Sequence, residues 1–171
     1  MISISETITK LKLHLIQHHL VLTAVESCTG GLVSSKLTDF EGSSRWFDRG
    51  FVTYSNQAKI DLVSVDPKVL EKYGAVSEQV AKQMALGGLI NSQSNYSISI
   101  TGIAGPGGGT EQKPVGMVCF GWAWISKDNQ YHSKVSTQLF KGDRQDIRLQ
   151  SANYSLISLL EIVSLHYPML K

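Results

Sequence analysis

A serine and a lysine that lie close together in this sequence are candidates for nucleophilic chemistry. Ser44 belongs to the segment Gly-Ser-Ser-Arg at 42–45, and Lys59 comes soon after Tyr54 and Asn56. A serine hydroxyl attacks a carbonyl carbon only when a neighbouring group accepts its proton. A lysine amine does this when burial or a nearby cation lowers its pKa. We therefore consider Ser44 as a nucleophile with Lys59 as its base; the competing interpretation is that Lys59 is an ordinary solvated lysine.

Histidine is the more usual base for a serine nucleophile, but no histidine of this chain falls in a recognisable motif. The five histidines are His14, His18, His19, His132 and His166, and the sequence contains no Gly-x-Ser-x-Gly nucleophile elbow. His14 and His18 have the i, i+4 spacing of a zinc-binding helix, but they do not form a His-Glu-x-x-His pattern. We therefore expect no metal site.

Cys28 is a rival nucleophile, because it lies beside a glycine turn where the start of a helix can lower the pKa of a thiol. It has no histidine partner that the sequence makes evident, so we rank it below the serine. The second cysteine, Cys119, lies inside an apolar run. Two such cysteines do not predict a disulfide framework.

The segment at 26–31, Glu-Ser-Cys-Thr-Gly-Gly, is expected to join a buried strand to a helix. Backbone N–H groups freed by glycine, together with the hydroxyls of Ser27 and Thr29, form a cradle for a phosphate or carboxylate. The alternative is a tight turn with ordinary capping, and from the residues alone the two interpretations stay open. Glu26 is suited either to orient a substrate hydroxyl or to cap neighbouring backbone.

A second glycine-rich segment, at 101–110, contains five glycines and follows another expected strand. Ligands of open α/β sheets bind at the carboxyl ends of strands, so this loop is a candidate binding site. It lacks the Gly-Lys-Ser/Thr ending of a P-loop and the glycine spacing of the dinucleotide fingerprint, which argues against both of those activities. The alternative is a flexible surface turn.

Hydrophobic periodicity predicts helices and strands that alternate along the chain. We expect strands over residues 20–25, 46–54, 96–101, 115–125 and 132–140, and helices over 3–19, 32–37, 57–62, from 67, over 77–91 and from 143 to the mid-160s. This alternation predicts one α/β domain, a three-layer α/β/α sandwich. The short turn between the last two strands makes the expected sheet mixed, although mostly parallel.

The length and charge of the chain narrow the class of protein to which it can belong. The 171 residues fit one domain, and 16 Lys and Arg against 14 Asp and Glu give a net charge of +2 with no long run of either sign. A nucleic-acid surface usually shows a basic stripe, so no nucleic-acid partner is expected. There is no signal-peptide pattern, and the longest apolar run is too short to span a membrane. We expect a cytoplasmic protein without membrane contact.

The order of these segments closely resembles the CinA C-terminal domain family. The resemblance lies in the segment at 26–31, Gly-Ser-Ser at 42–44, Gly-Phe-Val-Thr-Tyr-Ser-Asn at 50–56 with Lys59, Gly-Ala-Val-Ser at 74–77, the loop at 101–109, Lys-Pro-Val-Gly at 113–116 and Gly-Asp-Arg at 142–144. It covers nearly the whole chain. We therefore expect residues 1–171 to form one CinA C-terminal-like amidohydrolase domain.

The resemblance implies an enzyme. Stand-alone members of the family with this length are nicotinamide mononucleotide amidohydrolases, which release ammonia from the carboxamide and leave nicotinate mononucleotide for NAD salvage. The resemblance further implies a homodimer and a serine–lysine hydrolase that needs no metal or other cofactor. A non-catalytic nucleotide-binding or regulatory module of the same family is the alternative.

The resemblance also implies roles for individual residues. Ser44 would be the nucleophile, Lys59 the general base, and Tyr54 a proton relay or orienting hydroxyl. Arg144 would meet the phosphate or the carboxamide region, with Arg148, one helical turn further on, as the alternative. The residues expected to bind substrate are Ser27, Thr29, Gly30, Thr101, Gly102 and Arg144.

Overall fold

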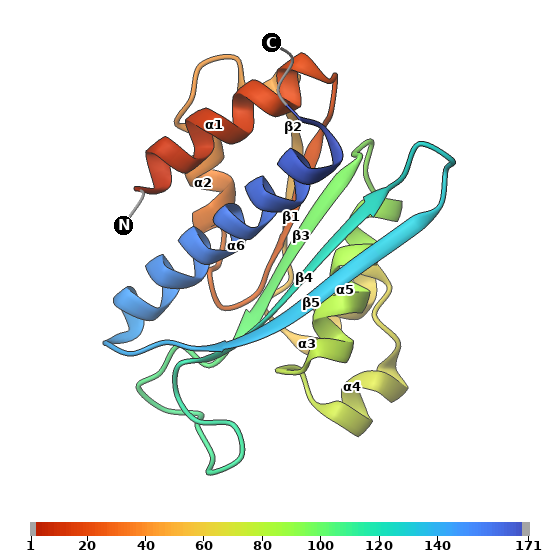
Figure 1. Ribbon diagram of the computed structural model, residues 1–171. Helices are drawn as coiled ribbons and strands as arrows, with labels where there is room; N and C mark the ends of the chain where they lie inside the picture. The colour runs from red at the N-terminus through yellow and green to blue at the C-terminus, as the bar shows by residue number, and fades with distance from the viewer. Residues whose placement is uncertain (1–2, 169–171) are drawn as a thin grey trace.

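Five strands form one sheet in the order β2-β1-β3-β4-β5 in the computed structural model, which describes residues 3–168 (Figure 1). β1 (Leu22–Glu26), β2 (Phe47–Val52) and β3 (Tyr96–Gly102) run parallel to one another. β4 (Met117–Ile125) is antiparallel to β3, and β5 (Tyr131–Leu139) is antiparallel to β4.

The expectation of a mixed sheet is confirmed, and three of the five strands, β2, β1 and β3, form its parallel part. Two of its four strand pairings are parallel and two are antiparallel. The reason is the connection from β3 to β4, which contains no helix, so the chain turns back directly along the edge of β3. β4 begins at Met117 rather than at residue 115, because Gly116 has a φ of +94° and its backbone approaches Phe140 closely.

Helices cover both faces of the sheet, which confirms the α/β/α sandwich (Figure 1). One face carries α1 (Ile4–Gln17), α2 (Leu32–Thr38) and α6 (Arg144–His166). The other face carries α3 (Asn56–Val63), α4 (Pro67–Tyr73) and α5 (Glu78–Ile90). A short 3₁₀ helix, η1 (Ser43–Arg45), precedes β2. No helix within residues 3–168 combines the length and the apolar character that crossing a membrane requires.

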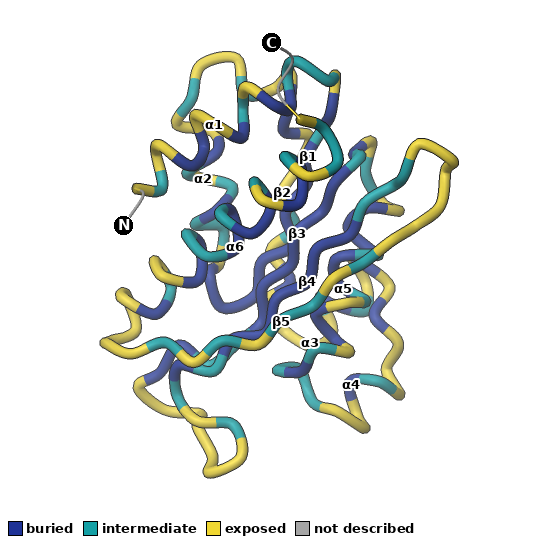
Figure 2. Tube along the Cα trace, viewed as in Figure 1, coloured by how far each residue is buried: buried dark blue, intermediate teal, exposed yellow. Residues whose placement is uncertain are grey.

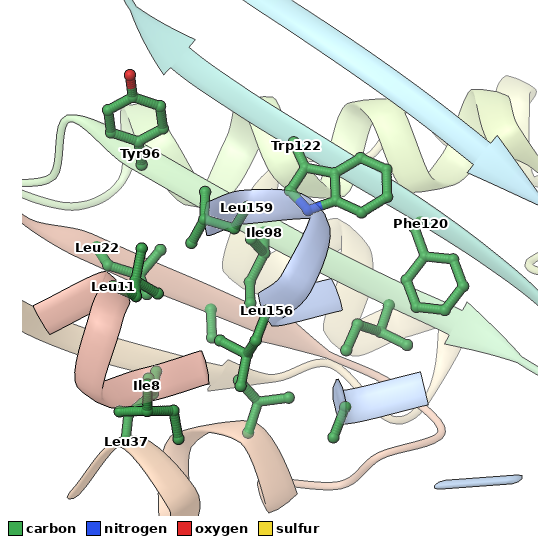
Figure 3. Packing of buried hydrophobic residues seen from close by; sticks show 14 of the residues in the cluster. Ile8, Leu11, Leu22, Leu37, Tyr96, Ile98, Phe120, Trp122, Leu156 and Leu159 are labelled. Carbon is green, nitrogen blue, oxygen red and sulfur yellow. The ribbon is translucent and has the colours of Figure 1, made fainter. Parts of the chain in front are cut away.

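The larger hydrophobic core lies between the sheet and the α1–α2–α6 layer. Ile98 and Trp122 from the strands face Leu156 and Leu159 from α6 in this core (Figure 3). The indole nitrogen of Trp122 is also satisfied, since it donates to the Ser155 carbonyl oxygen at 3.0 Å. Figure 2 shows the consequence: the central strands are buried along their length, whereas β5 at the edge is largely exposed.

On the other face, α5 packs closely against both α3 and the sheet because glycines lie at the points of contact. A Cβ added at Gly87 would lie 1.8 Å from the Val63 carbonyl oxygen, and one at Gly121 would lie 2.5 Å from the Ala81 carbonyl oxygen. These are backbone atoms, which cannot rotate away as a side chain can. α3, α5 and β4 therefore share an interface that tolerates only glycine at these points.

We expect Gly121→Ala to destabilise the protein by about 1–3 kcal/mol, because overpacking forces backbone shifts. The measurement is denaturant-induced unfolding followed by circular dichroism. Gly107→Ala is the matched control, since Gly107 has no atom within 4 Å of an added Cβ and no positive φ. Equal unfolding free energies for the two variants would contradict this packing argument.

Candidate functional site

The carboxyl ends of β1, β2 and β3 lie at one edge of the sheet, because these strands are parallel. Ser27 comes directly after β1, Tyr54 comes shortly after β2, and Thr101 and Gly102 end β3. Side chains from three separate segments of the chain are thereby brought together. They line a hollow of about 200 Å³.

Lys59 lines this hollow and is buried, with 1% of its surface exposed. Its Nζ lies 3.1 Å from Ser27 Oγ and donates to the Thr53 carbonyl oxygen at 2.9 Å. α3 aims the lysine inward: Ser55 caps the helix by accepting a hydrogen bond from the Ala58 N–H, and Lys59 follows in the first turn. A serine hydroxyl and a buried amine are thus held within hydrogen-bond reach of each other.

Burial lowers the pKa of Lys59 below its ordinary value of 10.5, and the smaller influence of the neighbouring Cys28 acts in the opposite direction. Desolvation disfavours the charged ammonium form relative to the neutral amine. A neutral amine has a lone pair that accepts a proton. The position next to Ser27 Oγ therefore suits Lys59 to act as a general base.

The structure does not bring Ser44 and Lys59 together. Ser44 lies in η1, immediately before β2, whereas Lys59 lies beyond the other end of that strand. A strand of this length spans roughly 20 Å, so Ser44 lies toward the opposite edge of the sheet. Ser44 is exposed and does not line the hollow. Ser27, which the sequence analysis treated as a substrate-binding residue, is the serine beside Lys59.

Tyr54 and Arg144 close the outer side of the hollow. The Tyr54 hydroxyl accepts a hydrogen bond from Arg144 Nη2 at 3.0 Å, and Arg144 Nη1 donates to the Gly105 carbonyl oxygen at 2.7 Å. Tyr54 is 61% exposed and lines the hollow, so it lies on the solvent side of the site. Arg144 therefore joins the segment after β2, the glycine-rich loop and the start of α6.

A second hollow of about 540 Å³ adjoins the first. The two share Ala104 and Arg144, and the second is also lined by Arg148. Arg148 Nη2 donates to the Thr29 carbonyl oxygen at 2.7 Å. The two arginines that were expected as alternatives therefore both line this region. Arg144 lies at the boundary of the two hollows, and Arg148 lines the second.

The remaining expected substrate-binding residues divide into two groups. Thr101 and Gly102 line the first hollow, and the Thr101 hydroxyl donates to the Ala75 carbonyl oxygen at 2.9 Å. A Cβ on Gly102 would lie 2.9 Å from the Met117 carbonyl oxygen, which explains the glycine. Thr29 and Gly30 lie in the same turn as Ser27 but line neither hollow.

Several residues of the hollow escaped the sequence analysis as pocket-lining residues, namely Asn56, Ala75, Val76 and Ala104. Ala75, Val76 and Ala104 are apolar loop residues, which give no chemical signal, and Asn56 is a polar residue at the start of α3. The role of Ser27 did have a signal. It follows a parallel strand, as Lys59 does, whereas Ser44 precedes one.

The two histidines with zinc-like spacing have other roles. His14 Nδ1 lies 3.0 Å from the Tyr167 carbonyl oxygen, and His14 Nε2 lies 3.2 Å from Ser164 Oγ. His18 Nε2 lies 3.2 Å from the Pro168 carbonyl oxygen. These contacts join α1 to the end of α6. Within residues 3–168, no group of three or more His, Cys, Asp and Glu side chains is arranged to hold a metal ion.

Comparison with known proteins places this geometry in context. The sequence model of the family described as the CinA C-terminal domain matches residues 4–163 of this chain. A nicotinamide-nucleotide amidohydrolase PncC from Enterobacter agglomerans is 53% identical over 79% of this chain and 80% of that protein. The PncC of Escherichia coli K12 is 46% identical over 81% of each chain. A crystal structure of a competence-damaged protein (CinA) superfamily protein from Enterobacter cloacae superposes with a TM-score of 0.89 at 37% identity, covering 96% of this chain and 94% of that one.

The burial of Lys59 predicts a pH-dependent cost in stability. Between its lowered pKa and 10.5, the unfolded chain binds more protons at this position than the folded chain does, so the folding contribution of Lys59 becomes more favourable as the pH rises. Relative to Lys59→Met, the wild type should therefore gain unfolding free energy from neutral to alkaline pH. Urea unfolding of both proteins across this range measures the difference. A difference that does not change with pH would show that Lys59 is not desolvated.

Both cysteines should resist alkylation in the native protein. Burial raises the pKa of the Cys28 thiol to about 12, and it also raises the pKa of Cys119. Only the thiolate reacts readily. We expect iodoacetamide at pH 7–8 to leave the folded protein unmodified and to label both cysteines in denaturant, as mass spectrometry can count. One rapidly labelled thiol in the native protein would restore Cys28 as a candidate nucleophile.

Proposed function

We propose, from the fact that this chain belongs to the CinA C-terminal domain family, that it is a nicotinamide-nucleotide amidohydrolase of NAD salvage. Its substrate is nicotinamide mononucleotide and its products are nicotinate mononucleotide and ammonia. The observation that carries the proposal is the contact of Ser27 Oγ with the buried amine of Lys59 at 3.1 Å. We assign the whole of residues 1–171 to this one catalytic domain.

Ser27 is the proposed nucleophile and Lys59 its general base. The neutral Lys59 amine takes the hydroxyl proton while Ser27 Oγ forms a bond to the carboxamide carbon. Thr53 supports this step, because its carbonyl oxygen accepts a hydrogen bond from the Lys59 amine. The lone pair of the amine therefore points away from Thr53. An amide is a poor electrophile, so the negative charge on its oxygen also needs donors, for which backbone N–H groups of the turn after Ser27 and of Gly102 are candidates.

The carbon–nitrogen bond then breaks, and the proton held by Lys59 reaches the leaving nitrogen, which departs as ammonia. Ser27 is left as the ester of the pyridine carboxylic acid. Water attacks this ester with Lys59 again accepting a proton, and the acid and the Ser27 hydroxyl are released. The Tyr54 hydroxyl lies at the mouth of the hollow, where it relays or orients the proton on its way to the leaving group.

The two adjoining hollows suit the two ends of a mononucleotide. The smaller hollow, with Ser27 and Lys59, takes the pyridine ring and its carboxamide. The larger one, bounded by Arg144 and Arg148, takes the phosphate. Guanidinium groups are well suited to bind phosphate oxygens in pairs. Arg144 contacts the substrate from the boundary of the two hollows. Thr101 and Gly102 line the smaller hollow, which takes the ring.

Thr29 and Gly30 line neither hollow, so their proposed role is to shape the turn that holds Ser27. We also propose that the enzyme is a cytoplasmic homodimer that acts on a small molecule and not on nucleic acid or membranes. The support for this is the family resemblance of the sequence and its near-balanced charge.

The alternative function is a nucleotide-binding or regulatory module without turnover. What favours the enzyme is that a nucleophile and a desolvated base lie in contact in the same hollow. A pure binding site has no need to bury a lysine next to a serine. Binding of nicotinamide mononucleotide without release of ammonia would decide for the module.

Ser27→Ala and Lys59→Met should each lower the rate of ammonia release by at least about a thousandfold, since nucleophile and base act as one unit. A coupled assay for ammonia with nicotinamide mononucleotide measures this, with circular dichroism to verify folding. Ser44→Ala is the matched control and should keep wild-type activity, because Ser44 lies outside the hollow. Loss of activity in Ser44→Ala but not in Ser27→Ala would reverse the assignment.

A further inference from the structure

Glu26, the residue directly before the proposed nucleophile, carries a buried carboxylate that the proposed reaction does not use. The residue is 1% exposed. Oε2 accepts hydrogen bonds from the backbone N–H groups of Gly31 and Val33, both at 3.0 Å. Oε1 accepts from the Ser34 N–H at 2.8 Å and from Ser34 Oγ at 2.7 Å. The carboxylate is thus bound to the start of α2 by four hydrogen bonds from uncharged donors.

These bonds replace the missing cap of α2. The N-cap residue of this helix is Gly31, which has no side chain with which to cap it. The first N–H groups of a helix need acceptors, and the positive end of the helix dipole favours a negative charge. Glu26 meets both requirements from the end of β1. Ser27 therefore lies in a turn whose two ends are fastened to each other by one side chain.

The main chain of Glu26 is connected to the base. Its carbonyl oxygen accepts a hydrogen bond from the Thr53 N–H at 2.8 Å, and the Thr53 carbonyl oxygen in turn accepts one from Lys59 Nζ. Beside it, the Ser27 N–H donates to the Ile100 carbonyl oxygen at 2.9 Å. Glu26 is therefore joined through its side chain to the turn of the nucleophile and through its backbone to the residue that holds the base.

We propose that Glu26 is a positioning residue for the Ser27–Lys59 pair, an inference that rests on the proposed function. Its side chain holds the turn so that Ser27 Oγ stays within reach of Lys59 Nζ. The group must be a carboxylate, because all four of its partners are donors and a glutamine would direct an NH₂ group at one pair of them. Misplacing a reacting atom by about 1 Å can cost about a hundredfold in rate.

The test compares Glu26→Gln with the wild type in two reactions. In the first, kcat for ammonia release should fall about a hundredfold with little change in KM, because the ring and phosphate contacts remain. In the second, a fluorophosphonate reacts with Ser27: Oγ bonds to phosphorus, fluoride leaves, and Lys59 takes the proton. This labelling needs no natural substrate, and its rate should fall by a similar factor.

The controls separate positioning from stability. Glu6→Gln is the same substitution at another helix cap, since Glu6 accepts hydrogen bonds from Ser3 at the start of α1, and it should leave both rates unchanged. Glu26→Asp keeps the charge and should recover part of the loss. If Glu26→Gln fails to fold, Ser34→Ala removes one of the four bonds and should lower both rates by a smaller factor. All rates are measured at a temperature well below the melting temperature of each variant.

The outcomes for the two proposals are distinct. If Glu26→Gln melts at a lower temperature but its folded form labels and turns over at wild-type rates, Glu26 is merely a structural cap and the inference is overturned. If labelling depends on Glu26 while the wild type releases no ammonia, the positioning role stands and the proposed function fails. If the wild type releases ammonia while labelling does not depend on Glu26, the proposed function stands and the positioning role fails.

Discussion

The contact between the Lys59 amine and the Ser27 hydroxyl sets conditions that the rest of the site has to meet. Lysine acts as a base near neutral pH only when its ammonium form is destabilised, and here burial supplies that effect. A buried amine is costly unless its hydrogen bonds are satisfied, and the Thr53 carbonyl oxygen and Ser27 Oγ satisfy them. The fold must therefore hold one carbonyl group and one hydroxyl group at fixed points around the buried amine.

The parallel half of the sheet meets these conditions, and the antiparallel half completes the enclosure. Because β1 and β2 end at the same edge, the segments that follow them deliver Ser27 and Thr53 side by side. β4 then returns along β3 without a crossover helix, which leaves the glycine-rich loop free to extend at that end of the sheet, next to the start of α6 (Figure 1). Arg144 binds this loop through the Gly105 carbonyl oxygen. The change of strand direction thus provides the outer wall of the site.

Local pattern was sufficient to predict most of the elements and the layers, but it did not indicate which serine lies beside the lysine. Ser44 and Lys59 are near each other in sequence, but β2 lies between them. Ser44 precedes the start of this strand and Lys59 follows its carboxyl end. The expected strand over 46–54 already implied this separation, so topology was a better guide than sequence distance. The burial of Lys59 was harder to foresee, since α3 is short and mixed in polarity, and the packing of α5 against it is set by distant glycines.

Charge connects the state of Lys59 to the progress of the proposed reaction. The ring of a nicotinamide nucleotide is cationic, and a positive charge beside an amine favours the neutral form that attack requires. Hydrolysis then replaces a neutral carboxamide with a carboxylate, which favours the protonated form of the same lysine. Arg144, at the boundary of the two hollows, would hold the phosphate at a fixed distance while this change takes place. Departure of the anionic product would remove that negative charge and again favour the neutral amine.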